Sequence, residues 1–418
     1  MSAKQLTDII GISQPTLSRA LKVFGDEIIR IGAGPSIQYA LKHPYRGFQS
    51  APIYRVSEVG KIKLLGELIP VYPQGYVMRQ ADGVASYSDG LPWWLFDMRP
   101  QGYLGRAFAS AYSNELGLSS NPEHWHDDEV IKALLFHGHD SVGNLLIGER
   151  AKAQFLSLPM PTEVDREAHY LKLALQTSSG ELPGSSAGGE QPKFCTYSDN
   201  GHVLVKFTAR EDNPVSERWR DLLLAEHLAL QVLGVQTKIV DIGSQRFLEI
   251  PRFDRQEALG RIGIFSLRAL DAEFIGRARD SWPVLVKELA RQQQIDMEAV
   301  RDTARRWAFG VLIGNTDMHH GNLSFISDHG RPYRLAPAYD MLPMAFAPKS
   351  GGELSNRLPA ANLIDAVDAA QWYEALNLAT EFYRLIESNP QFSESFLPCI
   401  AALATHLADA RQSIERLG

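Results

Sequence analysis

Cysteine is nearly absent from this sequence: Cys195 and Cys399 lie far apart in a chain of 418 residues. A disulfide framework is therefore not expected, and a reducing cytoplasm suits the composition better. No apolar run approaches the ~18 residues that a membrane-spanning helix needs. The first residues, MSAKQLTDII, have neither the basic start nor the apolar core of a signal peptide. These absences favour a cytoplasmic protein with no membrane partner.

The composition is otherwise that of a globular protein, with 44% hydrophobic and 22% charged residues. The length exceeds what one ordinary core accommodates and predicts two or three domains. Charge is unevenly spread, because the chain has a net charge of −7 yet basic residues outnumber acidic ones within residues 1–63. A basic head on an acidic body indicates that a polyanion would bind at the head.

The first residues have the capping and turn residues that are typical of a helix-turn-helix. A short helix is expected over residues 3–10, with Leu6, Ile9 and Ile10 facing inward, and Gly11 permits the turn that follows. Ser13 is in the position of an N-cap for a second helix, and Pro15 falls in its first turn, where its missing N–H is harmless.

The second helix, residues 14–24, is expected to bury one face and present the other to DNA. The predicted buried residues are Leu17, Ala20, Leu21 and Phe24. The predicted DNA-binding residues are Gln14, Thr16, Ser18, Arg19 and Lys22. Short β runs at 28–31 and 36–41 flank a Gly-Ala-Gly-Pro turn, which is typical of a wing. This segment resembles the winged helix-turn-helix domains of bacterial regulators, and DNA is its predicted partner. A small helical packing module is the alternative.

Residues 44–110 are rich in Tyr, Gly, Pro and β-branched residues, which favours several short strands. Helical patterning returns at 106–116 and 127–136, and a turn into a strand follows at 138–148. A zinc site is conceivable among the nearby histidines, but no cysteine supports it. These histidines are His124, His126, His137 and His139.

The stretch VLIGNTDMHHGNLSF at 311–325 places small polar groups between two apolar runs. Asp317 and Asn322 have the spacing of the protein-kinase catalytic loop, where the Asp accepts a hydroxyl proton and the Asn holds Mg²⁺. Asp340, in YRLAPAYDMLPM, follows at a distance that suits a second metal-binding carboxylate. The sequence lacks a DFG motif here, so the similarity lies in role and order.

Other kinase parts precede this loop in the expected order. Lys206, in the strand-like HVLVKFTA, could bind phosphates, and the small-residue loop at 183–194 could cradle them through backbone N–H groups. A helix from Pro214 follows, and either Glu217 or Glu226 could pair with the lysine. Each feature alone has an ordinary structural explanation, whereas their common order indicates a kinase.

From about residue 56 to the end, the sequence resembles the HipA-like serine/threonine kinases, toxins of bacterial toxin–antitoxin systems. The motifs are DSVGNLLIG, SAGGEQPKF, VLVKF, PRFDR, IGNTDMHHGNLSF and LAPAYDMLP. The resemblance is to the YjjJ-like branch, in which a winged helix is fused to the kinase. It implies an α+β protein: a winged helix-turn-helix, then a two-lobed HipA and protein-kinase-like fold with a β-rich amino lobe and a helical carboxyl lobe. The expected domains are a DNA-binding domain (1–50), a β-rich subdomain (51–160) and a kinase core with its helical lobe (161–418).

The resemblance also implies ATP and Mg²⁺ and assigns roles by position. Asp317, as the base, and His319 are then the catalytic residues, Asn322 and Asp340 bind the metal, and Ser186 or its neighbour Ser185 is the site of autophosphorylation. The positions implied to bind the nucleotide are Gly188, Gly189, Glu190, Gln191, Pro192, Lys193, Lys206, Pro251, Arg252, Phe253, His320, Gly321 and Tyr339. Two departures stand out, since many members have Lys where this chain has Gly321 and a small residue where it has Glu190.

The expected function is therefore an ATP-dependent serine/threonine protein kinase that acts as a growth-arrest toxin and regulates its own operon through its DNA-binding head. The family implies a protein substrate, with an aminoacyl-tRNA synthetase as the analogous target, and an antitoxin, while winged-helix regulators often form homodimers. Two alternatives come from other classes. One is a transcriptional regulator whose kinase-like body only senses a nucleotide, and the other is a small-molecule phosphotransferase.

Overall fold

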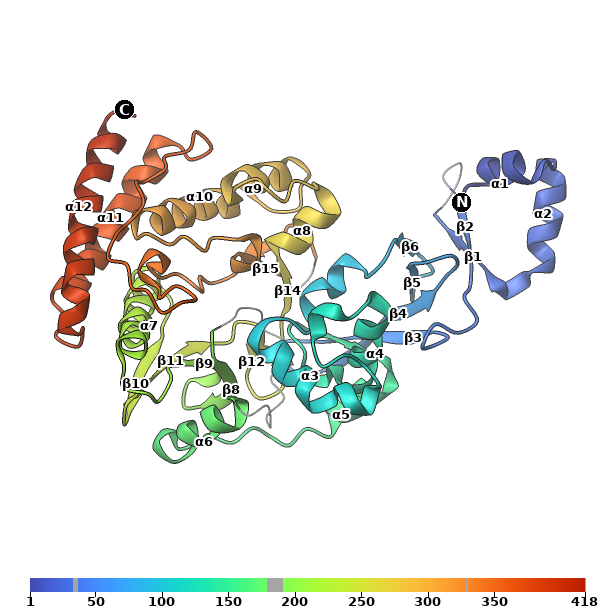
Figure 1. Ribbon diagram of the computed structural model, residues 1–418. Helices are drawn as coiled ribbons and strands as arrows, with labels where there is room; N and C mark the ends of the chain where they lie inside the picture. The colour runs from blue at the N-terminus through green and yellow to red at the C-terminus, as the bar shows by residue number, and fades with distance from the viewer. Residues whose placement is uncertain (33–36, 179–190, 328–329, 418) are drawn as a thin grey trace.

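A computed structural model describes residues 1–32, 37–178, 191–327 and 330–417. Helices and strands are mixed along the chain, and the fold class agrees with the predicted α+β arrangement of a winged-helix head, a β-rich amino lobe and a helical carboxyl lobe. The head lies at one end of the molecule and the last two long helices at the other (Figure 1).

The head is a helix-turn-helix followed by a two-stranded ribbon. Its elements are α1 (Ala3–Ile10), α2 (Gln14–Val23), β1 (Ile28–Ile31) and β2 (Gln38–Leu41). Gly11 ends α1 in the left-handed region (φ 72°), and the Ser13 side chain accepts a hydrogen bond from the Thr16 backbone N–H. β1 and β2 pair antiparallel, as a wing requires. The tip of the predicted wing falls on residues 33–36, outside the described residues.

Three of the residues predicted to be buried in the head are exposed. Ile9 and Ile10 are 69% and 56% exposed, and Phe24 is 49% exposed, so the prediction that they face inward was wrong. The cause is the small size of the head, because two helices of this length cannot enclose a core around Leu17. The wing gains its buried contact from outside the head, because Ile29 packs with Ile69 and Val77 of the sheet that follows in the chain.

The middle of the chain forms a sheet with helices on it. The sheet runs in the order β6-β5-β4-β3-β7. Its strands are β3 (Ala51–Val56), β4 (Ile62–Pro70), β5 (Tyr76–Gln80), β6 (Ala85–Ser88) and β7 (Leu145–Ile147). The helical elements are η3 (Trp93–Met98), α3 (Gly102–Leu116), α4 (Asp127–His137) and α5 (Gly148–Leu156). The strands up to residue 88 and the helices over 106–116 and 127–136 agree with the prediction, whereas residues 93–98 and 102–105 are helical where strands were favoured.

Two of the four histidines considered for zinc have protein partners far from each other in sequence. His137 lies 2.9 Å from a carboxylate oxygen of Glu115, whereas His126 caps α4 together with Glu129. In the part of the chain that the structure describes, no three His, Cys, Asp or Glu side chains gather as a metal site.

The amino lobe of the kinase-like body is a sheet in the order β10-β11-β9-β8 between two helices. Its elements are α6 (Arg166–Ser178), β8 (Lys193–Ser198), β9 (Gly201–Phe207), α7 (Pro214–Val232), β10 (Lys238–Ile242) and β11 (Gln245–Pro251). Side chains alternate between the faces. Val203 and Val205 pack with Tyr170 of α6, whereas Leu248 packs with Leu224 of α7. Lys206 therefore points to the side of the sheet that α7 covers.

The carboxyl lobe is mostly helical and encloses the largest core. Its strands are β12 (Arg255–Gln256), β13 (Gly260–Arg261), β14 (Gly263–Ser266), β15 (Ser324–Ser327) and β16 (Arg334–Leu335). Its helices are α8 (Leu267–Phe274), α9 (Trp282–Arg291), α10 (Met297–Leu312), α11 (Ala369–Glu387) and α12 (Leu397–Glu415). Over the described ranges, the helices are too short or too polar to cross a bilayer.

Candidate active site

Lys206, Glu226 and Asp340 meet between the two lobes. Lys206 Nζ donates a 2.5 Å hydrogen bond to Glu226 Oε1 on α7 and a second, very short bond to the Asp340 carboxylate. Lys206 and Glu226 are almost fully buried, and the Asp340 side chain is 23% exposed. The pair that the sequence left open is thus resolved, because Glu217 instead accepts a hydrogen bond from Ser395.

The charges of this cluster are set by burial and by one another. Burial alone would lower the pKa of Lys206, but the carboxylates of Asp340 and Glu226 outweigh it and raise that pKa above its ordinary value. Burial likewise opposes ionisation of Asp340, yet Lys206 and Lys193 lower its pKa. Lys206 therefore stays cationic and Asp340 anionic at neutral pH.

Asn315 links the loop that contains Asp317 to Asp340. Its side-chain oxygen accepts a 3.0 Å hydrogen bond from the Asp317 backbone N–H, and its amide nitrogen donates to the Asp340 carbonyl at 3.2 Å. Asn322 closes the other end of the loop by donating a 2.7 Å hydrogen bond to the Asp317 carbonyl. The Asp317 residue itself is exposed. Sequence reasoning missed Asn315, although an Asn two residues before Asp317 was visible in the motif NTD.

Asp340 adopts a left-handed backbone conformation, with φ of 51°. Non-glycine residues rarely do so, and the conformation costs about 1–3 kcal/mol unless the surroundings impose it. The Lys206 ammonium and the Asn315 amide are the groups that hold Asp340 here. Such strain is typical of residues whose side chain must point to a functional site.

Tyr339 joins the loop that contains Asp317 to the segment that follows β11. Its hydroxyl donates a 2.8 Å hydrogen bond to the Gly321 carbonyl and lies 2.7 Å from the Ser324 hydroxyl. Its ring packs against Phe253, with 5.7 Å between the ring centroids. The structure thus brings together two segments that were assigned to the nucleotide from the sequence.

The two loop histidines point in different directions. His319 Nδ1 accepts a 3.0 Å hydrogen bond from the Gly321 backbone N–H, and the His319 carbonyl accepts one from the Trp282 indole. His320 Nε2 donates to the Asp280 carbonyl, between α8 and α9, at 2.7 Å. A side chain at Gly321 would meet the His319 ring, at 2.9 Å from a new Cβ, so lysine at this position would require the ring to move.

Of the other residues assigned to the nucleotide from the sequence, some lie within the described residues and some do not. Lys193 begins β8 directly opposite Lys206, and burial lowers its pKa. Pro192 precedes it, and its carbonyl accepts the Phe207 N–H at 3.1 Å. Arg252, after Pro251, directs its guanidinium to Asp254. The assigned residues that lie outside the described residues are Ser185, Ser186, Gly188, Gly189 and Glu190.

Two residues of the site, one in the cluster and one in the loop that contains Asp317, have the donor atoms that suit a magnesium ion. Mg²⁺ prefers carboxylate and amide oxygens, which Asp340 and Asn322 supply. Because the Asn322 amide nitrogen donates to the Asp317 carbonyl, its side-chain oxygen is the atom left for a cation. Within the described residues, Glu226 Oε2 is buried and has no hydrogen-bond partner. This carboxylate oxygen, beside Lys206, can therefore accept a further hydrogen bond.

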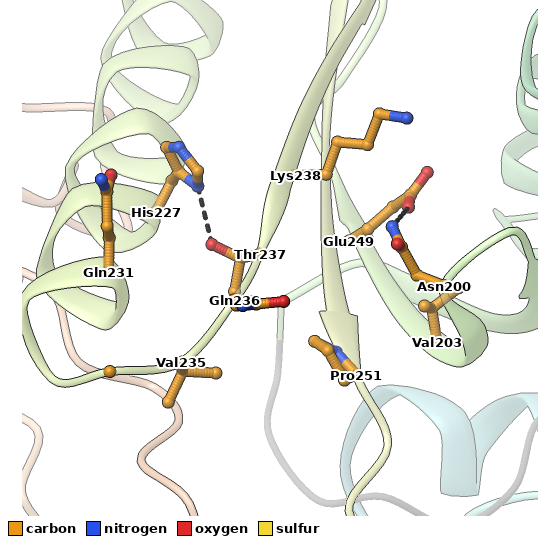
Figure 2. Close-up of a pocket in the computed structure, with 11 residues that line it drawn as sticks. Asn200, Val203, His227, Gln231, Val235, Gln236, Thr237, Lys238, Glu249 and Pro251 are labelled. Carbon is orange, nitrogen blue, oxygen red and sulfur yellow. Dashed lines mark hydrogen bonds between the residues drawn. The ribbon is translucent and has the colours of Figure 1, made fainter.

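A separate groove of about 730 Å³ opens beside β10 and β11. It is lined by side chains such as His227, Thr237 and Glu249, and Figure 2 shows His227 bonded to Thr237 and Asn200 bonded to Glu249. Of its lining residues, only Pro251 was assigned to the nucleotide from the sequence. The Lys206 cluster, and not this groove, is therefore the candidate active site.

The residues predicted to bind DNA all lie on the exposed side of α2. Only Leu17 of this helix is buried. All five predicted residues are exposed: Gln14, Thr16, Ser18, Arg19 and Lys22. Arg19 folds back so that its Nε donates to the Pro15 carbonyl at 3.4 Å, a weak bond that the side chain can give up.

Comparison with known proteins places the chain in a family. The model for the middle domain of YjjJ-like toxins matches residues 48–156, and the model for the HipA-like C-terminal domain matches residues 185–396. The chain belongs to the HipA-like toxin family, in its YjjJ-like branch.

Two relatives define this position further. The Toxin YjjJ of Escherichia coli (strain K12) is 38% identical over 432 residues, which span the whole of this chain and 97% of that protein. The fold also resembles that of a chain in a solved complex from Shewanella oneidensis MR-1, which contains the toxin–antitoxin proteins HipA and HipB with their operator DNA; the TM-score between the two chains is 0.50. The two sequences are 16% identical, and the matched part covers 86% of this chain and 97% of that chain, so this comparison supports the fold alone.

Proposed function

We propose that this protein is an ATP-dependent serine/threonine protein kinase that acts as a growth-arrest toxin in the cytoplasm. The observation that carries the proposal is the contact of Lys206 with both Glu226 and Asp340, together with the Asn315 bridge from Asp340 to the Asp317 loop. A kinase requires the Lys–Glu pair and the metal-binding Asp to be in place at once.

Each residue then has a role that its position supports. The exposed Asp317 would orient a substrate hydroxyl and accept its proton. Lys206, fixed by Glu226, would offset phosphate charge, and Asn322 and Asp340 would hold Mg²⁺. When bound, Mg²⁺-ATP supplies the transferable phosphoryl group and the cation that neutralises it. The segment Pro251–Phe253 would meet the adenine, with Tyr339 supporting Phe253.

The regulatory part of the proposal concerns the head and the segment around Ser186. The exposed basic face of α2 supports DNA binding, through which the toxin would repress its own operon. Autophosphorylation at Ser186 or Ser185 would silence the kinase. An antitoxin, a homodimer and an aminoacyl-tRNA synthetase as substrate are extensions that rest on the family alone.

A phosphate-transfer assay tests the proposal. Purified protein with radiolabelled ATP and Mg²⁺ should label itself or a protein of the host lysate, and Asp317→Asn should not. ATP-dependent operator binding without any labelling would instead favour a nucleotide-sensing regulator. Labelling of aminoglycosides but of no protein would favour a small-molecule phosphotransferase.

A further inference from the structure

Asp254 lies at the centre of a buried charge network directly after the proposed adenine segment. Its Oδ1 accepts a 2.9 Å hydrogen bond from Arg252 Nε, and its Oδ2 accepts bonds from Arg252 Nη2 at 2.8 Å and Arg255 Nη1 at 2.5 Å. Oδ2 also accepts a 3.1 Å bond from the backbone N–H of Gly143, which belongs to the middle domain. The Asp254 side chain is 6% exposed. One carboxylate thus holds the adenine segment and a turn that lies 111 residues away in sequence.

Arg255 extends the same connection into the middle domain. Its Nη2 donates to the Ser141 carbonyl and to Asp140 Oδ1, both at 2.9 Å, and its Nη1 donates to the Gly143 carbonyl at 3.3 Å. Arg261, paired with Arg255 across β12 and β13, donates to the carbonyl of residue 139 at 2.5 Å. The turn at residues 139–143 is therefore held by two arginines as well as by Asp254.

The network remains ionised at neutral pH. Burial would raise the pKa of Asp254, but Arg252 and Arg255 hold it well below its ordinary value. Burial lowers the pKa of Arg261 to about 9, which still leaves that side chain cationic. A buried ionic network is costly unless every member is paired, so the loss of one partner should loosen the whole of it.

The network lies where it can set the position of the adenine segment. The Arg252 backbone N–H donates to the His202 carbonyl of β9 at 2.9 Å, and Phe253 packs against Tyr339. Asp254 follows immediately and holds the Arg252 side chain. The turn of the middle domain is therefore tied to the adenine segment through Asp254, while Phe253 of that segment contacts Tyr339.

We infer that Asp254 is a positioning residue through which the middle-domain turn at 139–143 fixes the adenine segment Pro251–Phe253. The inference deepens the proposed function and rests on it for the identity of the nucleotide. It predicts that the middle domain contributes to nucleotide affinity without touching the nucleotide.

Amide hydrogen exchange and ATP kinetics on the full chain test this inference with Asp254→Asn. Asp221→Asn is the matched control, because Asp221 is another buried carboxylate of the kinase-like body but binds Ser393, away from this segment. We expect the amides of Gly143 and Arg252 to exchange at least tenfold faster in Asp254→Asn and at the wild-type rate in the control. The KM for ATP should rise about tenfold with little change in kcat, as expected when binding geometry is lost.

A second variant, Arg255→Lys, guards against misfolding because it keeps the charge but loses the planar fork. It should accelerate exchange at residues 139–143 and raise the KM for ATP in the same direction. Unchanged exchange at Gly143 in both variants, or an unchanged KM with a kcat lowered in proportion to the folded fraction, would overturn the inference. The exchange measurement does not depend on phosphate transfer. A wild-type protein without kinase activity would therefore reject the proposed function, and the exchange rates alone would then decide the positioning role.

Discussion

Glu226, and not Glu217, is the carboxylate that holds Lys206: the Lys206 ammonium and Glu226 Oε1 are 2.5 Å apart in the buried space between α7 and the sheet. This contact fixes α7 against the amino lobe, while Asp340 contacts the same ammonium from the carboxyl lobe. Lys206 therefore contacts both lobes at once, and its two contacts depend on how the lobes are placed relative to each other. Its environment is the structural basis of the predictions that follow.

Glu226→Gln should reduce phosphate transfer by about tenfold to a hundredfold, because Lys206 would lose its charged partner on α7 and swing toward Asp340. Glu217→Gln is the control, since Glu217 only accepts a bond from the exposed Ser395. Steady-state labelling with radiolabelled ATP measures both variants, with circular dichroism to verify folding. Equal loss in the two variants would contradict the assigned pair.

Asn315→Ala should lower kcat by about tenfold or more while the KM for ATP changes little, because the Asp317 loop and Asp340 would lose their common support. Asn200→Ala removes a side chain of the same type from the separate groove and should leave kcat unchanged. A kcat for Asn315→Ala close to that of the wild type would show that the bridge between Asp317 and Asp340 is dispensable.

Acidification should destabilise the fold through His406, which is buried, and His227, which is partly buried. Burial lowers the pKa of His406 and of His227 below the ordinary value of 6.5. As the pH falls through 6.5, the unfolded chain binds protons that the folded chain binds only at lower pH, so the free energy of unfolding decreases. Urea unfolding at pH 7.5 and 5.5 measures the difference.

His406→Gln should reduce this pH dependence, because the buried ring that donates to the Val311 carbonyl is gone while His227 remains. His124→Gln, at an exposed position, is the control. A pH dependence that is the same in the wild type and His406→Gln would show that His406 does not contribute to it.

Arg19→Ala and Lys22→Ala should each weaken binding of the full chain to its operator and reduce the slope of affinity against salt concentration by about one. Lys349→Ala, an exposed lysine of the carboxyl lobe, should change neither quantity. Fluorescence anisotropy over a salt series provides both numbers. Unchanged slopes for both head variants would place the DNA contacts elsewhere.

Local patterns in the sequence predicted the helices and strands well, whereas contacts between residues far apart in the sequence could not be predicted from it. Ser13, Pro15 and Gly11 marked the helix-turn-helix because caps and turns depend on near neighbours. Glu217 and Glu226 are nine residues apart, about two and a half helical turns, so they lie on opposite faces of α7. Which face meets the sheet depends on tertiary packing, and the sequence could not decide.

The errors and omissions have the same origin. Ile9 and Ile10 were expected inside because the helix is amphipathic, but burial also needs a partner surface, and α1 buries none of its residues. Asp254 was part of a recognised motif, yet its link to Gly143 spans 111 residues and no local pattern indicates it. The segment around Ser186 lies outside the described residues, so its assignment to phosphate binding and autophosphorylation stays a prediction.

Transfer of labelled phosphate from ATP by the wild-type protein and by Asp317→Asn is the most direct test of the central claim. A positioned general base contributes about a hundredfold to ten-thousandfold to rate, so the variant should lose at least about a hundredfold in kcat while it still binds ATP with Mg²⁺. Transfer at the same rate in both proteins, or in neither, would contradict the assignment of this site as a kinase centre.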